Sequence, residues 1–243
     1  MKTLPAVLTM VAVALGASVL IVGRFGASGT GAIPAVNDTA SEATTTGMPP
    51  PWRIQVHAPD SIEALGLELG HSKLGDAVQR YGVNTQVAVI AAPGEDGRLE
   101  AFVDPFQADF IGGKLVISAE ASSEQLKVWR SRAVKGEFME STTRRYVLAT
   151  NDLVEALKSR VVGLSFIPQA QLDAAAVIAR FGEPTERVTI PDHGEHLLYP
   201  AKGVDVMIDP NGKELIQYVT PAEFDARLMA PLRQAQSKAQ AAR

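Results

Sequence analysis

The chain of 243 residues contains no cysteine. This absence excludes disulfide bonds, thiolate metal sites, a cysteine nucleophile and the lipidated cysteine of bacterial lipoproteins. The sequence also has no excess of basic residues, because its formal net charge is −4 and its pI is near 5.6. Nucleic-acid-binding proteins normally present a basic face or stripe. We therefore expect no nucleic-acid partner.

Sequence patterns that mark common enzyme sites are missing as well. The segment Gly66-Leu-Glu-Leu-Gly70 lacks the third glycine and the lysine that a phosphate-binding loop requires. No serine stands in a Gly-x-Ser-x-Gly nucleophile elbow. We predict that the chain is not an enzyme, and we expect no catalytic residue and no cofactor.

Histidine is scarce, with four in the chain, and two of them stand close together in His193-Gly-Glu-His196. A proline before this segment and the glycine within it predict a turn that leads into a strand. We interpret both histidines as surface residues of that turn and expect no metal site. The alternative is a zinc site built by His193 and His196, helped by Glu195 and His71. That alternative defines a metal-dependent periplasmic enzyme.

Four aspartates are candidates for acid–base work or for calcium binding, namely Asp104, Asp109, Asp205 and Asp209. Asp104 and Asp209 each precede a proline at the end of a predicted strand. The hydrogen bonds of an aspartate to its own backbone account for that position. We assign no site to them.

The N-terminus carries one long apolar run, because residues 4–22 contain no charge. As a helix this run rises roughly 28 Å, which matches the hydrocarbon core of a bilayer. The pattern predicts a membrane anchor or signal at 1–24 and, from its Gly, Ala, Ser, Thr and Pro content, a flexible linker at 25–51. We expect a single-pass inner-membrane protein with its globular domain in the periplasm. Cleavage of a signal peptide, leaving a soluble periplasmic protein, is the alternative.

The segment from Val161 to Phe224 predicts one strand, one helix and an antiparallel meander. Apolar residues from Gln169 to Phe181 recur at helical spacing, and Gly182 ends the helix. Strand-like runs follow at 187–190, 196–199, 204–208 and 214–219, and Asn211-Gly212 is a hairpin signal.

An upstream segment repeats this pattern. Leu74 to Gly82 matches Ala174 to Gly182 in its apolar, arginine, aromatic and glycine positions, which suggests an internal duplication. The predicted fold is therefore α+β, with two tandem units, each a helix followed by an antiparallel meander, joined by a helical connector behind an N-terminal transmembrane helix. The predicted boundaries are 52–119 for the first repeat, 120–160 for the connector, 161–224 for the second repeat and 225–243 for a C-terminal helix with a polar tail.

At Phe181-Gly-Glu-Pro184, between a helix and a meander, the chain resembles the SmpA/OmlA family. That family includes the small lipoprotein of the bacterial outer-membrane β-barrel assembly machine, and the tandem arrangement is similar to that of the β-lactamase inhibitor proteins. Gly82 and Gly182 occupy the family's helix-ending glycine, whereas the first copy has Val83-Asn84 in place of the proline pair. The chain is also similar to proteobacterial envelope proteins, and the resemblance implies a periplasmic domain.

These observations favour a non-catalytic periplasmic module for protein interaction or envelope assembly, tethered to the inner membrane. We expect its partner to be another envelope protein, with the N-terminal helix in the membrane. Exposed sheet edges and four aromatic residues, Trp52, Trp129, Tyr146 and Tyr199, are candidates for the binding surface.

Overall fold

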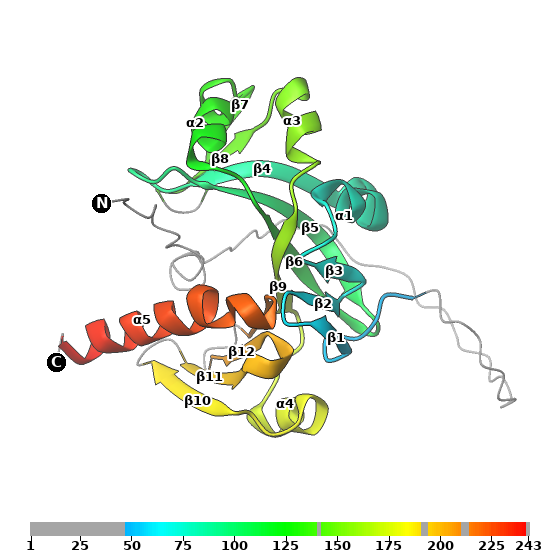
Figure 1. The fold of residues 1–243 in the computed structure, drawn as a ribbon, viewed down its shortest axis with the longest axis vertical. Coiled ribbons are helices and arrows are strands. Elements are labelled where there is room, and N and C mark those ends of the chain that lie inside the picture. Colours follow the sequence, from blue (N-terminus) through cyan, green and yellow to red (C-terminus); the bar gives the residue numbers. More distant parts are fainter. Residues whose placement is uncertain (1–46, 140–141, 191–193, 210–213, 242–243) are drawn as a thin grey trace, which may run out of the picture.

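Figure 1 shows the fold in the computed structural model, which describes residues 47–139, 142–190, 194–209 and 214–241. The described α-helices are α1 (Leu74–Tyr81), α2 (Ser123–Ser131), α3 (Thr150–Ala156), α4 (Ala174–Phe181) and α5 (Ala230–Ala241). Short helical turns lie at Gly82–Asn84, Pro200–Lys202, Pro221–Glu223 and Asp225–Met229. The strands are β1 (Ile54–Ala58), β2 (Ser61–Ala64), β3 (Leu67–Leu69), β4 (Thr85–Ala91), β5 (Arg98–Ala108), β6 (Ile111–Ala119), β7 (Lys135–Phe138), β8 (Arg144–Val147), β9 (Val161–Pro168), β10 (Glu186–Ile190), β11 (Gly194–Tyr199), β12 (Val204–Ile208) and β13 (Leu215–Tyr218).

Ten of these strands form one antiparallel sheet in the order β10-β11-β12-β13-β9-β6-β5-β4-β8-β7, and β1-β2-β3 form a separate small sheet. The prediction of two tandem helix-plus-meander units is wrong. β6 and β9 pair from Gly113 opposite Pro168 to Ala119 opposite Val161, so both meanders belong to one sheet. The predicted connector adds β7 and β8 to that sheet as well. The physical reason is that two separate small sheets would expose strand edges, and the continuous sheet pairs them.

The helices α1 and α4 form where the repeated pattern predicted helices. The Asp173 side chain accepts a hydrogen bond from the Ala176 backbone N–H at 2.7 Å and caps the start of α4. Both helices end at glycines with positive φ, +74° at Gly82 and +83° at Gly182. A side chain is strained at such a φ, so glycine is the residue that lets the chain turn out of the helix.

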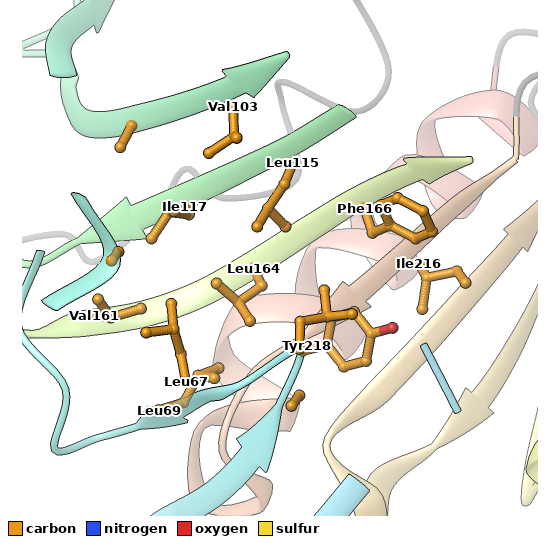
Figure 2. Close-up of a cluster of buried hydrophobic side chains, with 14 of the residues drawn as sticks. Leu67, Leu69, Val103, Leu115, Ile117, Val161, Leu164, Phe166, Ile216 and Tyr218 are labelled. Atoms are coloured by element: carbon orange, nitrogen blue, oxygen red, sulfur yellow. The ribbon is translucent and has the colours of Figure 1, made fainter. Parts of the chain in front are cut away.

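The main hydrophobic core lies on one face of the large sheet. β6 alternates strictly between buried and half-buried residues, which turns Leu115 and Ile117 into this core. Figure 2 shows them beside Leu164 and Phe166 of β9 and the fully buried Tyr218 of β13. The small sheet, α1, α2 and α4 supply the residues that cover this face.

The opposite face of β10 and β11 is covered by the C-terminal segment, which crosses these strands in Figure 1. Phe224, Leu228 and Leu232 are buried there with Leu198 of β11 and Val188 of β10. These three residues form an apolar stripe along the C-terminal segment. This end of the sheet is consequently buried on both faces.

The prediction of a transmembrane helix with a signal anchor is corrected. Across residues 47–139, 142–190, 194–209 and 214–241, no helix is long and apolar enough to cross a membrane. A spanning helix needs about 20 apolar residues, whereas α5, with 12 residues, carries glutamines, an arginine and a lysine. The predicted anchor at 4–22 lies outside the described residues. We therefore withdraw the inner-membrane localisation.

The residues just before β1 pack against the domain. Met48 contacts the main core, and Pro51 is buried. The Tyr218 hydroxyl donates a hydrogen bond of 2.8 Å to the Pro51 carbonyl oxygen, across 167 positions of the sequence. The end of the predicted linker is therefore fixed to the centre of the large sheet.

Candidate functional site

Of the two histidines in the predicted turn, the structure describes one. His193 lies outside the described residues. His196 is not a surface residue, because it lies within β11 and its side chain is 2% exposed. It stands opposite Val188 of β10 and Met207 of β12. Leu198, two residues further along β11, packs in the cluster beneath the C-terminal segment, so His196 lies on that same face of the sheet.

His196 forms a buried pair with Asp205 of β12. Its Nδ1 lies 2.9 Å from Asp205 Oδ2 and 3.1 Å from Oδ1. An ionised carboxylate only accepts hydrogen bonds, so His196 Nδ1 carries the proton and donates. The Nε2 atom of the same ring is buried and has no hydrogen-bond partner among the described residues.

This pair does not make a catalytic site of the triad kind. A histidine activates a nucleophile when its second ring nitrogen accepts a hydrogen bond from the hydroxyl or thiol of that nucleophile. No described residue makes that bond to His196 Nε2, and 2% exposure of the side chain keeps substrate away. We therefore assign no enzymatic activity to the pair.

The residues of the alternative zinc site are not brought together in the described part of the chain. His71 lies before α1, and its Nδ1 is 3.4 Å from Glu68 Oε1. Glu195 lies 3.6 Å from Arg187 and follows the opposite face of β11 from His196. Across the described residues, no group of three or more His, Asp or Glu side chains is arranged to hold a metal ion.

The four candidate aspartates are dispersed. Asp104 of β5 lies 3.3 Å from Lys114, and Asp109 occupies the tip of the β5–β6 hairpin. Asp205 is the partner of His196, and Asp209 follows β12. β13, β9 and β6 separate β12 from β5 in the sheet, so these carboxylates build no common site.

The four aromatic residues proposed for binding divide into core and surface. Trp129 and Tyr199 are each 3% exposed and belong to the main core. Tyr146 is half-buried beneath Arg130, whose guanidinium carbon lies 5.1 Å from the ring centroid. Only Trp52 of the four belongs to the surface group described next.

Trp52, Phe110 and Arg180, which we call the Arg180 cluster, meet at one end of the large sheet. The guanidinium carbon of Arg180 lies 4.2 Å from the Trp52 ring centroid and 6.0 Å from that of Phe110. The two ring centroids are 5.8 Å apart at an interplanar angle of 54°. Phe110 is 66% exposed although it is large and apolar. Arg180 is exposed and forms no ion pair with any described residue.

Three distant segments build this cluster. Trp52 precedes β1, Phe110 is at the turn between β5 and β6, and Arg180 is in the last turn of α4. The backbone N–H of Asp109 donates a hydrogen bond of 3.0 Å to the Met48 carbonyl oxygen. That bond fixes the hairpin tip to the segment just before Trp52. Sequence reasoning missed Phe110 and Arg180, although an aromatic residue in a hairpin turn is a signal that could have identified the first.

A cavity of about 480 Å³ shares residues with the surroundings of the cluster. It is lined by Met48 to Pro50, Arg53, Asp109 and residues of the β2–β3 hairpin. Its charged groups are of both signs, and its apolar groups come from the proline segment and from Ala64 and Leu65 of the β2–β3 hairpin. Arg53, like Arg180, forms no ion pair with any described residue.

A second cavity, of about 430 Å³, lies at the start of α3 and has a different character. Arg132 and Asp152 both line it, and these two side chains form an ion pair with each other. The main charges of this cavity are thus already matched. We do not consider it further as a binding site.

No protein-family model matches the chain, and comparisons with curated proteins and with solved structures find no match. The resemblance to the SmpA/OmlA family therefore stays a prediction.

Proposed function

We propose that the chain is a non-catalytic protein-interaction module that binds an acidic, extended segment of a partner protein at the Arg180 cluster. The observation that carries this proposal is the position of the Arg180 guanidinium, which lies against Trp52 and beside Phe110 with no carboxylate of the described chain as its partner.

Stacking prepares an arginine for binding. A guanidinium against an aromatic ring loses rotational freedom, but its N–H donors lie in its plane and stay available to a carboxylate. The entropy of ordering this long side chain is then lost on folding rather than on binding. A carboxylate of the partner is the complement that Arg180 lacks within the described chain.

The composition of the cluster also fits a binding surface. Tryptophan and arginine are the residue types most often responsible for binding energy at protein interfaces. An exposed phenylalanine beside them offers apolar area that a partner would bury. The neighbouring cavity falls within the range of about 300 to 1,000 Å³ that is usual for binding pockets, and it extends the surface towards Arg53.

Selection of peptides from a random display library on the full chain tests the proposal. We expect enriched sequences to contain aspartate or glutamate next to apolar residues. Affinity for an enriched peptide should fall at least about tenfold in Arg180→Gln and in Phe110→Ala, because each loses one central contact.

The control is Arg233→Gln, which changes a 61% exposed arginine of α5. This variant should bind the selected peptides as the unchanged protein does. Enrichment of basic or neutral peptides only, or equal affinities of the Arg180→Gln and Arg233→Gln variants, would show that the Arg180 cluster is not the binding site.

A further inference from the structure

β7 is one edge of the ten-stranded sheet, and β8 is its one partner among the described strands. Three of its four residues are exposed, and Glu137 is half-buried. Phe138 is 67% exposed, and Val134 just before the strand is 74% exposed. An edge strand with exposed apolar residues is a template for pairing with another strand.

The hydrogen bonds of the β7–β8 hairpin determine which backbone N–H and C=O groups of β7 point away from β8 and are available to another strand. Lys135 stands opposite Val147 and Phe138 opposite Arg144, and in the same register the Met139 N–H donates to the Thr143 carbonyl oxygen at 2.9 Å. Hydrogen-bonded pairs alternate along an antiparallel ladder. Glu137 and Lys135 therefore direct their backbone groups to β8, and Gly136 and Phe138 direct theirs away from the sheet.

The side chains around Gly136 are self-complementary. In an antiparallel pair of two β7 strands with Gly136 opposite Gly136, each Lys135 stands opposite Glu137 of the second copy. Val134 is left out of this register, because its N–H donates to the Val147 carbonyl oxygen at 2.9 Å and is therefore directed to β8. Opposite charges thus meet directly on both sides of Gly136, and such cross-strand pairs stabilise a sheet. Gly136 has no side chain to separate the strands at the centre.

The other edge of the sheet does not have this property. An antiparallel pair of two β10 strands centred on Val188 would place Arg187 opposite Thr189 and Glu186 opposite Ile190. In that register neither charged residue stands opposite a residue of the other charge. The apolar residues of β10, Val188 and Ile190, are already buried under the C-terminal segment.

We propose that two copies of this chain associate through β7, in an antiparallel pair centred on Gly136, to form one continuous sheet. Gly136 of each copy exchanges both backbone hydrogen bonds with Gly136 of the other. In the single chain Glu137 forms ion pairs with Lys135 of the same strand and with Arg145 of β8, and across the dimer axis Lys135 and Glu137 of each copy also meet the opposite charge of the other copy. The arrangement is isologous, so the assembly closes at two copies.

Charge exchange tests this register. Lys135→Glu places glutamates opposite each other, and Glu137→Lys places lysines opposite each other. Each variant alone should show a dimer dissociation constant at least about tenfold higher than the unchanged chain in sedimentation velocity over a concentration series. An equimolar mixture of the two variants should recover association, because every cross-strand pair is then of opposite charge.

Gly136→Pro tests the backbone pairing independently of charge. Proline removes an N–H that points away from the sheet, so β7 keeps its bonds to β8 while the pair across the axis is lost. Thermal unfolding of each variant shows that it is folded before association is measured. The control is the exchange of Lys158 and Glu155, an exposed ion pair on and after α3, which should leave association unchanged.

A chain that remains monomeric at all concentrations would overturn the proposal. So would a mixture of Lys135→Glu and Glu137→Lys that associates no better than either variant alone. Because the Arg180 cluster involves none of these residues, peptide binding there should be the same in all of them.

Discussion

The Nδ1 atom of His196 lies 2.9 Å from Asp205 Oδ2 in a part of the sheet that is covered on both faces. The side chains are 2% and 1% exposed, so water does not compensate either one if its partner is removed. Removing one member of a buried pair costs more than replacing both, because an uncompensated polar or charged group is left behind.

We predict that His196→Leu and Asp205→Leu each lower the free energy of unfolding by about 3 kcal/mol. The double variant should cost clearly less than the sum, since neither partner is left alone. Urea unfolding of the two single variants and the double variant, analysed as a double-mutant cycle, measures the coupling. Additive losses would mean that the two side chains do not stabilise each other.

The Tyr218 hydroxyl is predicted to hold the segment before β1 on the domain. Burial raises the pKa of Tyr218 well above its ordinary value of 10.0, so the hydroxyl stays protonated and donates to the Pro51 carbonyl oxygen. Tyr218→Phe should lower the free energy of unfolding by about 1 kcal/mol and should speed proteolysis near Pro51. The control is Tyr146→Phe, whose hydroxyl bonds to no described residue and whose loss should change neither measurement.

The helix-ending glycines are predicted to act through backbone conformation alone. A Cβ at Gly82 would meet nothing within 4 Å, and at Gly182 it would meet only the Lys202 Nζ at 3.9 Å. Gly82→Ala and Gly182→Ala should therefore each cost about 1 kcal/mol, from the positive φ and not from a clash. Gly47→Ala, where space is open and φ lies outside the left-handed region, is the control and should be neutral in urea unfolding. Losses of several kcal/mol at Gly82 would point to a collision that the structure does not show.

Local sequence signals predicted the strands between 187 and 219 near their observed bounds. The predicted strand at 204–208 coincides with β12, and the predicted helix ends at Gly82 and Gly182 are observed. Alternation and glycine position are local properties, so one sequence contains them. The pairing of β6 with β9 joins residues about 50 positions apart, and no local pattern specifies it.

Sequence reasoning did not identify the candidate sites, for two different physical reasons. His196 and Asp205 stand in strands that are covered on both faces, where burial no longer alternates along the strand, so a buried histidine could be taken for a turn residue. The Arg180 cluster assembles from segments near 52, 110 and 180, which become neighbours only in the folded sheet.

The last prediction concerns Glu100 of β5, whose side chain is 13% exposed and lies 3.0 Å from the Arg98 Nε atom. Burial raises the pKa of Glu100 above its ordinary value of 4.5, and the nearby Arg98 offsets this in part. Between the unfolded and the folded pKa, the folded chain binds more protons than the unfolded chain. The free energy of unfolding therefore falls as pH rises through this window.

Glutamine has nearly the same shape and no proton to lose, so Glu100→Gln should remove this part of the pH dependence. Well below the ordinary pKa of 4.5 the two proteins should differ little, because Glu100 is then protonated in both states. Above the folded pKa the glutamine variant should be the more stable protein, by an amount that stays constant as pH rises further. Urea unfolding at a series of pH values measures the difference, with Glu124→Gln on the exposed first turn of α2 as the control. A difference of the same size at pH 4 and pH 7 would contradict the assignment, because burial of the ionised carboxylate would then not be its source.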